Sequence, residues 1–326
     1  MKKILITGGA GFIGAHVVKH FAKKYTNDQI INLDCLTYAA ELKNLSDIES
    51  YENYKFLKIN INNAKDIDDV FKKYNITHVI HLAAESHVDR SIENSIDFAL
   101  TNVIGTVNLL NAAKKNWSDD RNHLFYHIST DEVYGSLGLE GSFKESTKYD
   151  PKSPYSASKA SSDHFVRSYY NTHNLPIVIS NCSNNYGPFQ HHEKFIPTII
   201  KAIKQKKALP IYGDGSNIRD WLYVSDHVLA IESIFNNGKV GESYNVGGGF
   251  EISNKDLALK IIEFYKKLNN DNFNFNQLIK YVDDRKGHDF RYSIDSSKLK
   301  KKLGWKPKIN FHEGLIKTIN WYSENL

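Results

Sequence analysis

The sequence predicts an α/β protein with a doubly wound parallel sheet, followed by a smaller and irregular α/β part. Three observations support this fold class: strand-like runs that are apolar throughout, helical patterns that alternate with them, and a glycine-rich turn after the first run. Uniformly apolar strands are typical of a parallel sheet covered on both faces. Their alternation with helices is the pattern of the doubly wound fold.

The expected elements follow in chain order. Strands are expected at residues 3–7, 29–34, 54–59, 77–83, 123–129 and 176–181, and helices beginning near Phe12, Ala64, Ser95 and Ser153. After about residue 180 the pattern loosens, with Pro188, Pro197 and Pro210 and loop-like stretches at 213–220 and 247–250. Short helices are expected near 254–268 and 312–324. The strand-like segments 221–225 and 243–248 are candidates to return to the first domain.

Composition excludes several classes of protein. The 326 residues are 41% hydrophobic and 24% charged, as in ordinary globular proteins. No apolar run of about 18 residues occurs, so neither a transmembrane helix nor a membrane partner is expected. The first residues, MKKILITGGAG, are interpreted as a strand and not as a signal peptide.

Cys35 and Cys182 lack metal or redox spacing, which favours a cytoplasmic protein. The net charge of +5 comes from lysine-rich segments such as 201–207 and 298–304, interpreted as solvated helix faces, so no nucleic-acid partner is expected.

The segment ILITGGAGFIG predicts a dinucleotide-binding turn. Gly8, Gly11 and Gly14 lie between the first strand and the first helix, and Gly9 completes a G-x-G-x-x-G spacing. Glycines allow the backbone to approach a pyrophosphate at the helix N-terminus. The second strand ends in Asp34, whose carboxylate can accept hydrogen bonds from ribose hydroxyls and would repel a 2′-phosphate. NAD is therefore expected over NADP, and a purely structural glycine turn is the alternative.

Tyr155 and Lys159 are candidate catalytic residues. They are four positions apart in PYSASKASSDHF, so on a helix their side chains leave the same face. We expect the ammonium, with the positive nicotinamide ring, to lower the pKa of the phenol. Tyr155 could then take the proton of an alcohol while hydride leaves the same carbon. Two unrelated surface residues are the alternative.

The segment STDEVYG places Thr130, Asp131 and Glu132 directly after an apolar strand. Two neighbouring carboxyls that are buried cannot both ionise cheaply, so one is pushed towards its protonated form. The pair could therefore supply an acid and a base at neutral pH. A turn that exposes both acids to solvent is the alternative.

These motifs, together with HLAAESHVDRSI, NCSNNYGPFQ, YGDGSNIRDWLYVSDH and DRKGHD, resemble the extended short-chain dehydrogenase/reductase family, and within it the nucleotide-sugar 4,6-dehydratases. The resemblance extends from residue 5 to about 295. It implies an NAD-dependent lyase of deoxysugar biosynthesis that acts on a nucleotide-diphosphate glucose, with dTDP-glucose converted to dTDP-4-keto-6-deoxyglucose. C4 is oxidised, water is eliminated across C5 and C6, and the hydride returns to C6. The implied roles are Tyr155 as base with Lys159 beside it, Thr130 on the C4 oxygen, Glu132 as base at C5, and Asp131 as acid for the C6 hydroxyl.

The resemblance also implies contacts with both ligands. Cofactor contacts are expected from Gly8, Gly11, Phe12, Ile13, Gly14, Asp34, Cys35, Leu36, Thr37, Asn60, Ile61, Leu82, Ala83, Ala84, Ser86, Thr101, Tyr155, Lys159 and Asn185. Substrate contacts are expected from Ser86, Thr130, Asn184, Lys194, Phe195, Pro210, Ile211, Tyr212, Arg219, Asn254, Arg285 and His288. Asn60 stands where the family usually has Asp, and Lys286 where it commonly has Pro. His191 and His192 are expected to point apart, and no metal site is expected.

Residues 1–180 are expected to form an NAD-binding Rossmann domain, with return segments near 219–247, and residues 181–326 mainly a nucleotide-sugar-binding domain. The family implies a homodimer through helices near 95–115 and 153–173. Three alternatives stay open: a UDP-glucose 4,6-dehydratase, a 4-epimerase and a non-catalytic NAD-binding scaffold. The acid pair argues against an epimerase, and the intact Tyr155 and Lys159 argue against a scaffold. Thymine and uracil differ by one methyl group, worth about one to three kcal/mol, so the sequence leaves both bases open.

Overall fold

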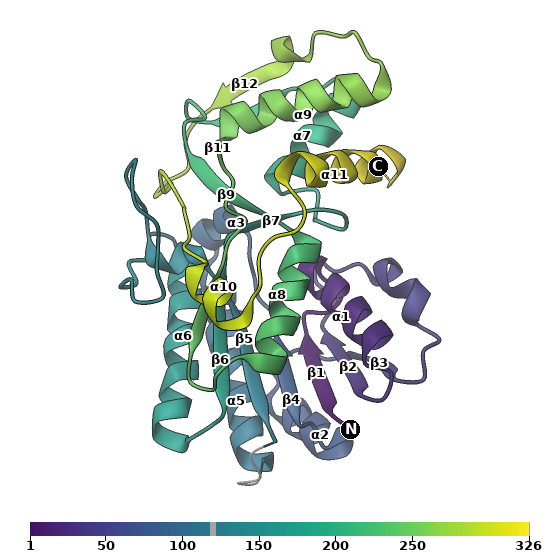
Figure 1. Cartoon of the computed structure of the whole chain (residues 1–326), viewed down its shortest axis with the longest axis vertical. Coiled ribbons are helices and arrows are strands. Elements are labelled where there is room, and N and C mark those ends of the chain that lie inside the picture. Colours follow the sequence, from purple (N-terminus) through teal and green to yellow (C-terminus); the bar gives the residue numbers. More distant parts are fainter. Residues whose placement is uncertain (118–121, 326) are drawn as a thin grey trace.

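The computed structural model of the protein describes residues 1–117 and 122–325. Within these residues a parallel sheet of seven strands forms the centre of the molecule, in the order β10-β6-β5-β4-β1-β2-β3 (Figure 1). Its strands are β1 (Lys3–Thr7), β2 (Gln29–Asp34), β3 (Tyr54–Lys58), β4 (His78–His81), β5 (Leu124–Thr130), β6 (Ile177–Cys182) and β10 (Ser243–Val246). The predicted doubly wound α/β fold is confirmed, and each of the six expected strand segments contributes one strand.

The two faces of the sheet are covered by different helices. On one face pack α1 (Phe12–Lys24), α8 (Val224–Asn237) and α10 (Ser297–Leu303), and on the other α2 (Ala64–Tyr74), α5 (Gly105–Asn116) and α6 (Pro154–His173). In β1, Ile4 and Ile6 belong to the first of these cores and Leu5 to the second. Burial on both faces is why the strands are apolar at consecutive positions.

Helix α6 begins where its sequence predicts. The Ser153 Oγ accepts a hydrogen bond from the Ser156 N–H at 3.1 Å, and the Ser156 Oγ accepts one from the Ser153 N–H at 3.0 Å. Pro154 occupies the first turn, where its missing N–H costs nothing. This cap fixes Tyr155 and Lys159 in the first two turns. The helix expected from Ser95 is divided into α4 (Ser95–Phe98), a π-helical stretch (Ala99–Ile104) and α5, and α3 (Val88–Glu93) precedes it.

The irregular part expected after residue 180 forms a lobe above the carboxyl ends of the strands (Figure 1). Helices α7 (Phe195–Lys204), α9 (Asn254–Asn269) and α11 (Phe311–Asn325) share its apolar core, which includes Ile199, Ile261 and Ile319. Its strands are β7 (Asn184–Tyr186), β8 (Leu209–Tyr212), β9 (Ile218–Tyr223), β11 (Glu251–Ser253) and β12 (Ile279–Val282). Short 3₁₀ helices span Leu42–Ile48, Asp131–Tyr134 and Phe275–Leu278.

Of the two segments expected to return to the first domain, one joins the central sheet and the other pairs with strands of the lobe. Residues 243–246 form β10, which pairs with β6 at the edge of the central sheet. Residues 221–223 belong to β9, which pairs with β7 and β11 in the lobe. The chain then enters α8, which packs on α1 and returns to the first domain. The domain boundary at residue 180 stays a prediction. None of the described helices has the length and apolarity needed to cross a membrane.

Candidate active site

Two adjoining cavities lie at the carboxyl edge of the central sheet, the place where doubly wound folds bind ligands. We call the first the sheet-edge cavity, because it is lined from the turn after β1, the ends of β2, β4 and β5, and helix α6. The second, the lobe cavity, lies between α3 and the lobe. Both are lined by Ser86, Glu132, Asn184, Glu193 and Lys194, so the cavities meet at these side chains.

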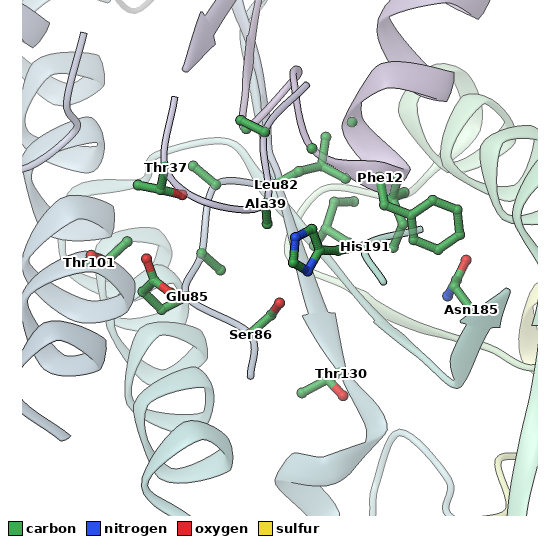
Figure 2. Close-up of a pocket in the computed structure, with 18 of the residues that line it drawn as sticks. Phe12, Thr37, Ala39, Leu82, Glu85, Ser86, Thr101, Thr130, Asn185 and His191 are labelled. Atoms are coloured by element: carbon green, nitrogen blue, oxygen red, sulfur yellow. The ribbon is translucent and has the colours of Figure 1, made fainter. Parts of the chain in front are cut away.

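All residues expected to contact the cofactor line the sheet-edge cavity, except Leu36 (Figure 2). Leu36 has a left-handed backbone, with φ of 60°, and its N–H donates to the Asp34 Oδ1 at 2.8 Å. It therefore shapes the turn that holds Asp34. The sequence analysis gave no cofactor contact to several other lining residues, namely Tyr38, Ala39, Ala40, Gln190, His191 and Glu193. These residues reach the cavity through the path of their loops, which a sequence pattern does not predict.

The glycine turn fits a dinucleotide. A Cβ at Gly14 would lie 2.0 Å from the Gly8 carbonyl oxygen, and one at Gly8 would lie 2.7 Å from Ala83 Cα. Both glycines are therefore needed for close packing of strand, turn and helix. A Cβ at Gly11 would meet only the Gly8 oxygen, at 3.4 Å, so a side chain there would occupy the cavity. Space that only a glycine leaves open beside the N-terminus of α1 suits a pyrophosphate.

Asp34 is oriented for ribose recognition. Its Oδ2 accepts from the Ala10 N–H at 3.0 Å, while its Oδ1 accepts from Leu36. These two amides hold the carboxylate at the cavity wall, and its remaining lone pairs can accept hydrogen bonds from hydroxyls. A carboxylate at this point would repel a phosphate, in agreement with the preference for NAD over NADP.

The acid pair lies inside the protein. Thr130, Asp131, Glu132, Tyr155 and Lys159 all line the sheet-edge cavity, and Asp131 is only 1% exposed. Thr130 ends β5, where its Oγ1 accepts from the Glu132 N–H at 3.3 Å and lies 3.4 Å from the Asp131 Oδ1. The alternative of two acids turned out into solvent is therefore wrong.

The surroundings of Asp131 and Glu132 shift the pKa values of the two acids differently. Burial raises the pKa of Asp131 well above its ordinary value, and the negative charges of Glu132 and Asp220 raise it further. Burial also raises the pKa of Glu132, but the positive charges of Arg219, Lys194 and Arg285 oppose that rise. Asp131 is consequently the group favoured to hold a proton, and Glu132 the one favoured to ionise.

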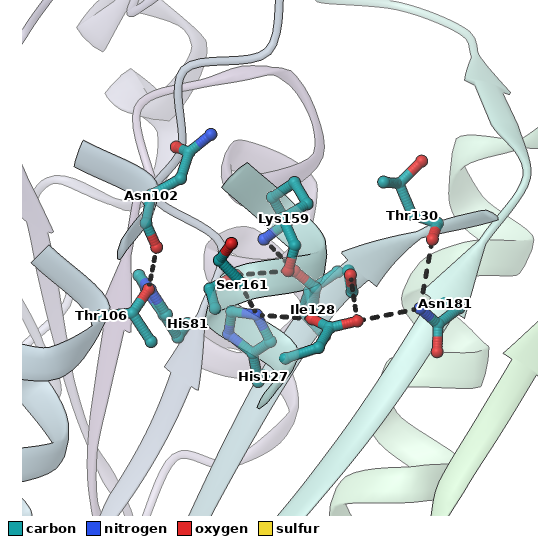
Figure 3. Close-up of polar contacts among 12 residues, drawn as sticks. His81, Asn102, Thr106, His127, Ile128, Thr130, Lys159, Ser161 and Asn181 are labelled. Carbon is teal, nitrogen blue, oxygen red and sulfur yellow. Dashed lines mark hydrogen bonds and ion pairs between the residues drawn. The ribbon is translucent and has the colours of Figure 1, made fainter. Parts of the chain in front are cut away.

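The protein's own groups do not lower the pKa of Tyr155 as Lys159 was expected to do, and the effect of the nicotinamide ring stays a prediction. Burial raises the pKa of Tyr155 well above its ordinary value, and the carboxylate of Glu132 adds to the rise. Lys159 does not counteract this, because its Nζ is directed to the Ile128 carbonyl oxygen, to which it donates at 2.9 Å (Figure 3). Burial also lowers the pKa of Lys159, against the opposing charge of Asp163. The protein's own groups thus keep the phenol protonated.

A buried polar network ties α6 to β5 behind these residues. The Asp163 Oδ2 accepts from the Ser129 hydroxyl at 2.9 Å and the Tyr149 hydroxyl at 2.8 Å. The Asn181 Nδ2 donates to the Thr130 carbonyl at 3.1 Å and approaches the same Asp163 oxygen (Figure 3). Sequence reasoning missed Asp163. Its one available signal was its place four residues beyond Lys159, on the same helix face.

The lobe cavity gathers the residues expected to bind the substrate, with two exceptions. Thr130 lines the sheet-edge cavity, and Ile211 lies in the core of the lobe. Alternation along β8 explains Ile211, because Pro210 and Tyr212 are exposed on the opposite face of that strand. The unpartnered buried polar atoms that border this cavity in the described part of the chain include the Asn184 Oδ1 and the Trp221 Nε1. They offer one acceptor and one donor to a polar ligand.

Of the three arginines that line the lobe cavity, the two expected to bind the substrate, Arg219 and Arg285, both contact protein acceptors. Arg285 forms a two-pronged ion pair with Asp89 of α3, with Nε–Oδ1 at 2.5 Å and Nη2–Oδ2 at 2.9 Å. Arg219 donates to the Asp289 carbonyl at 2.9 Å and lies over the Tyr292 ring. Their remaining N–H groups present positive charge to the cavity, as a diphosphate requires.

The two departures from the family pattern, Asn60 and Lys286, have local explanations, and the pair His191 and His192 differs from its expectation. The Asn60 Oδ1 accepts from the Asn62 N–H at 2.9 Å, which closes a small turn. The His288 N–H donates to the Arg285 carbonyl at 3.2 Å, and Gly287 has φ of 67°, so the turn at Lys286 forms without proline. His191 and His192 do not point apart: their ring centroids are 4.1 Å from each other, because the chain turns back at 191–194.

Comparison with known proteins agrees with this geometry. A family model described as GDP-mannose 4,6 dehydratase matches residues 5–318. A probable dTDP-glucose 4,6-dehydratase of Sinorhizobium fredii is 50% identical over 99% of this chain and 93% of its own. The dTDP-glucose 4,6-dehydratase of Salmonella typhimurium is 48% identical over the same shares of the two chains.

Among solved structures, DesIV of Streptomyces venezuelae, a dTDP-glucose 4,6-dehydratase with NAD and TYD bound, is 40% identical. The match covers 99% of this chain and 97% of that one, with a TM-score of 0.92. With both cavities at the expected edge of the sheet and the match extending over nearly the whole sequence, the chain belongs to the nucleotide-sugar 4,6-dehydratase family.

Proposed function

We propose that this protein is a dTDP-glucose 4,6-dehydratase that keeps NAD bound and converts dTDP-glucose to dTDP-4-keto-6-deoxyglucose and water. The observation that carries the proposal is the acid pair beside Tyr155 and Thr130, with Asp131 buried and Glu132 half-buried, in a cavity that also fits a dinucleotide. Support for the nucleotide comes from relatives named as dTDP-glucose 4,6-dehydratases. Two free cysteines, one of them buried, are compatible with the expected cytoplasmic location.

The proposed roles follow from the placement of each side chain. Bound NAD would accept the hydride from C4 and later return it to C6, and its positively charged ring would favour ionisation of Tyr155. Tyr155 removes the proton of the C4 hydroxyl, and Thr130 donates a hydrogen bond to the C4 oxygen.

Elimination uses the acid pair. Oxidation places the C5 proton next to a ketone, which makes it acidic enough for Glu132 to remove. Asp131, protonated because of its burial, gives its proton to the C6 hydroxyl as that group leaves as water. After hydride returns to C6, Glu132 gives its proton back to C5. The balance is the loss of one water with no net change in oxidation state.

The diphosphate of the substrate is assigned to the lobe cavity, where Arg219, Arg285 and Lys194 supply positive charge. Glu132 and Asn184 line both cavities, so the hexose would occupy the passage between them. In the proposed arrangement, the sugar carbons would lie against both the acid pair and the nicotinamide side of the sheet-edge cavity.

The proposal is tested by incubating the purified protein with dTDP-, UDP- and CDP-glucose in parallel, without added NADH. A 4-keto-6-deoxy sugar is expected from dTDP-glucose, detected by its alkaline absorbance and a mass loss of one water. Turnover of UDP-glucose alone would reassign the nucleotide. Appearance of only a C4 epimer would reassign the reaction, and absence of any product with bound NAD would favour a scaffold.

We also propose that the protein is a homodimer. Ile96, Leu100 and Ile104 are large apolar side chains at four-residue intervals, and they are 65%, 44% and 47% exposed. Phe165 on the adjacent helix α6 is 41% exposed. An apolar stripe across two neighbouring helices is suited to burial against a second copy of itself.

A further inference from the structure

Four side chains to which the sequence analysis gave no role converge at the rim of the sheet-edge cavity. They come from three separate segments: Tyr38 from the loop after β2, Arg90 from α3, and His191 and Glu193 from the loop before α7. The Arg90 guanidinium lies over the Tyr38 ring, 3.7 Å from its centroid, and pairs with the Glu193 carboxylate. The Tyr38 and His191 rings meet edge to face at 5.4 Å. Arg90 thus links the other two segments.

This cluster borders the proposed cofactor site. Tyr38, His191 and Glu193 line the sheet-edge cavity, together with Asp34 and Thr37. Figure 2 shows Thr37, Ala39 and His191 around the same space. We call residues 36–41 the strap. Its last residue is held by a hydrogen bond from the Glu41 N–H to the Ala10 carbonyl at 2.9 Å, in the glycine turn.

The charges of the cluster persist at neutral pH. Burial acts to raise the pKa of Glu193, but the hydrogen bond with Arg90 and the positive charges around it together outweigh this, so the net shift is downward. Burial raises the pKa of Tyr38 to about 12, so its ring stays neutral. A guanidinium between a carboxylate and an electron-rich ring face is attracted to both.

We propose that Arg90 is a positioning residue that clasps the strap, through Tyr38, to the Glu193 segment and thereby slows release of bound NAD. The inference rests on the proposed function, because only a reaction that removes and returns the same hydride requires the cofactor to stay through all three steps. Loss of NADH after oxidation at C4 would leave the keto sugar without its hydride. A clasp made of contacts between three chain segments opposes that loss without touching the reacting carbons.

The test measures the rate at which bound NADH leaves the protein, followed by the fall in its fluorescence after mixing with excess NAD. Arg90→Ala and Tyr38→Ala are each expected to speed release about three- to tenfold, from the strength of a partly exposed cation–π contact. Arg90→Lys keeps the charge but loses the planar stacking surface, so it is expected to release faster than wild type as well. Tyr38→Phe keeps the ring and is expected to release NADH close to the wild-type rate.

Two comparisons of release rates distinguish a positioning role of Arg90 from a general loss of stability. The double variant Arg90→Ala/Tyr38→Ala is expected to release NADH no faster than either single variant, since both remove one contact. Tyr51→Ala removes a tyrosine of similar exposure, 36% against 38% for Tyr38, outside the residues that line the cavity. It is expected to leave the release rate unchanged.

Unchanged release in both single variants, or additive effects in the double variant, would overturn the inference and leave the proposed reaction standing. A protein that binds no NADH at all would instead overturn the proposed function. The two failures are therefore distinguishable in one set of measurements.

Discussion

Asp131 and Glu132 are neighbours in sequence but have different surroundings. Asp131 is almost fully buried, and its Oδ2 has no hydrogen-bond partner among residues 1–117 and 122–325. Glu132 lies where the two cavities meet, and the positive charges of Lys194 and two arginines act to lower its pKa. These different surroundings favour a proton on Asp131 and a negative charge on Glu132.

The first prediction separates these roles. Glu132→Gln is expected to abolish exchange of the C5 hydrogen with solvent deuterium, while oxidation at C4 continues. Asp131→Asn is expected to slow loss of water about 10²- to 10⁴-fold, the usual contribution of a general acid, with a smaller effect on oxidation. Mass spectrometry of the sugar and single-turnover formation of bound NADH measure both steps. Undiminished exchange in Glu132→Gln would assign the C5 base elsewhere.

The second prediction concerns stability and pH. Because burial raises the pKa of Asp131, the folded protein holds this proton at pH values where the unfolded chain has lost it. Stability contributed by this group is thus present at low pH and falls as pH rises from about 3.9 towards the raised value. Asp131→Asn does not ionise, so its Tm is expected to exceed that of wild type increasingly from pH 4.5 to pH 7.5.

The matched control for that measurement is Asp150→Asn, whose side chain is 67% exposed. It is expected to change Tm by a similar small amount at every pH. A constant difference between Asp131→Asn and wild type across this range would mean that Asp131 ionises freely in the folded protein.

At the scale of single elements, the N-termini of α1 and α6 position the residues of the candidate site. The glycine turn brings α1 close to β1 and leaves space for a pyrophosphate, while the Ser153–Ser156 cap fixes the register of α6. Each start is encoded within a few residues. For this reason the ends of β1 and α1 and the placement of Tyr155 and Lys159 agree with their sequence predictions.

The third prediction tests the glycine turn. Gly14→Ala would bring a Cβ to 2.0 Å from the Gly8 oxygen, so the turn must shift. It is expected to lower the free energy of unfolding by about 1–3 kcal/mol and to reduce the NAD that copurifies. Urea denaturation and the absorbance ratio of the purified protein measure the two effects. Gly138→Ala, with no atom within 4 Å of its Cβ, is the control and is expected to stay within about 0.5 kcal/mol.

At the scale of the whole molecule, the lobe is tied to the sheet across the lobe cavity. Asp89 of α3 holds Arg285 with both oxygens, and the Tyr212 hydroxyl lies 3.3 Å from the Asp89 Oδ2. The Lys194 Nζ donates to the Ser86 carbonyl at 2.7 Å. These bridges fix the distance between the two walls of the cavity without closing it.

The fourth prediction concerns assembly. If Ile96, Leu100 and Ile104 form the proposed dimer interface, Leu100→Glu buries a charge in each subunit and is expected to give a monomer in light scattering. Leu139→Glu is the control, because Leu139 is 79% exposed in a loop and is not one of the residues of the stripe, and it is expected to leave the mass of a dimer. A monomeric wild type, or an unchanged mass for Leu100→Glu, would contradict the proposed interface.

The central sheet, the glycine turn, Asp34 and the start of α6 could be predicted from the sequence, because each depends on residues close together in the chain. Which charged groups face one another became clear only in the folded structure. The direction of Lys159 towards Ile128, the core position of Ile211, and the meeting of Tyr38, Arg90 and Glu193 all depend on segments far apart in sequence. Burial and charge act through space, so the pKa of Tyr155 and the unequal acids could be assigned only once the chain was folded.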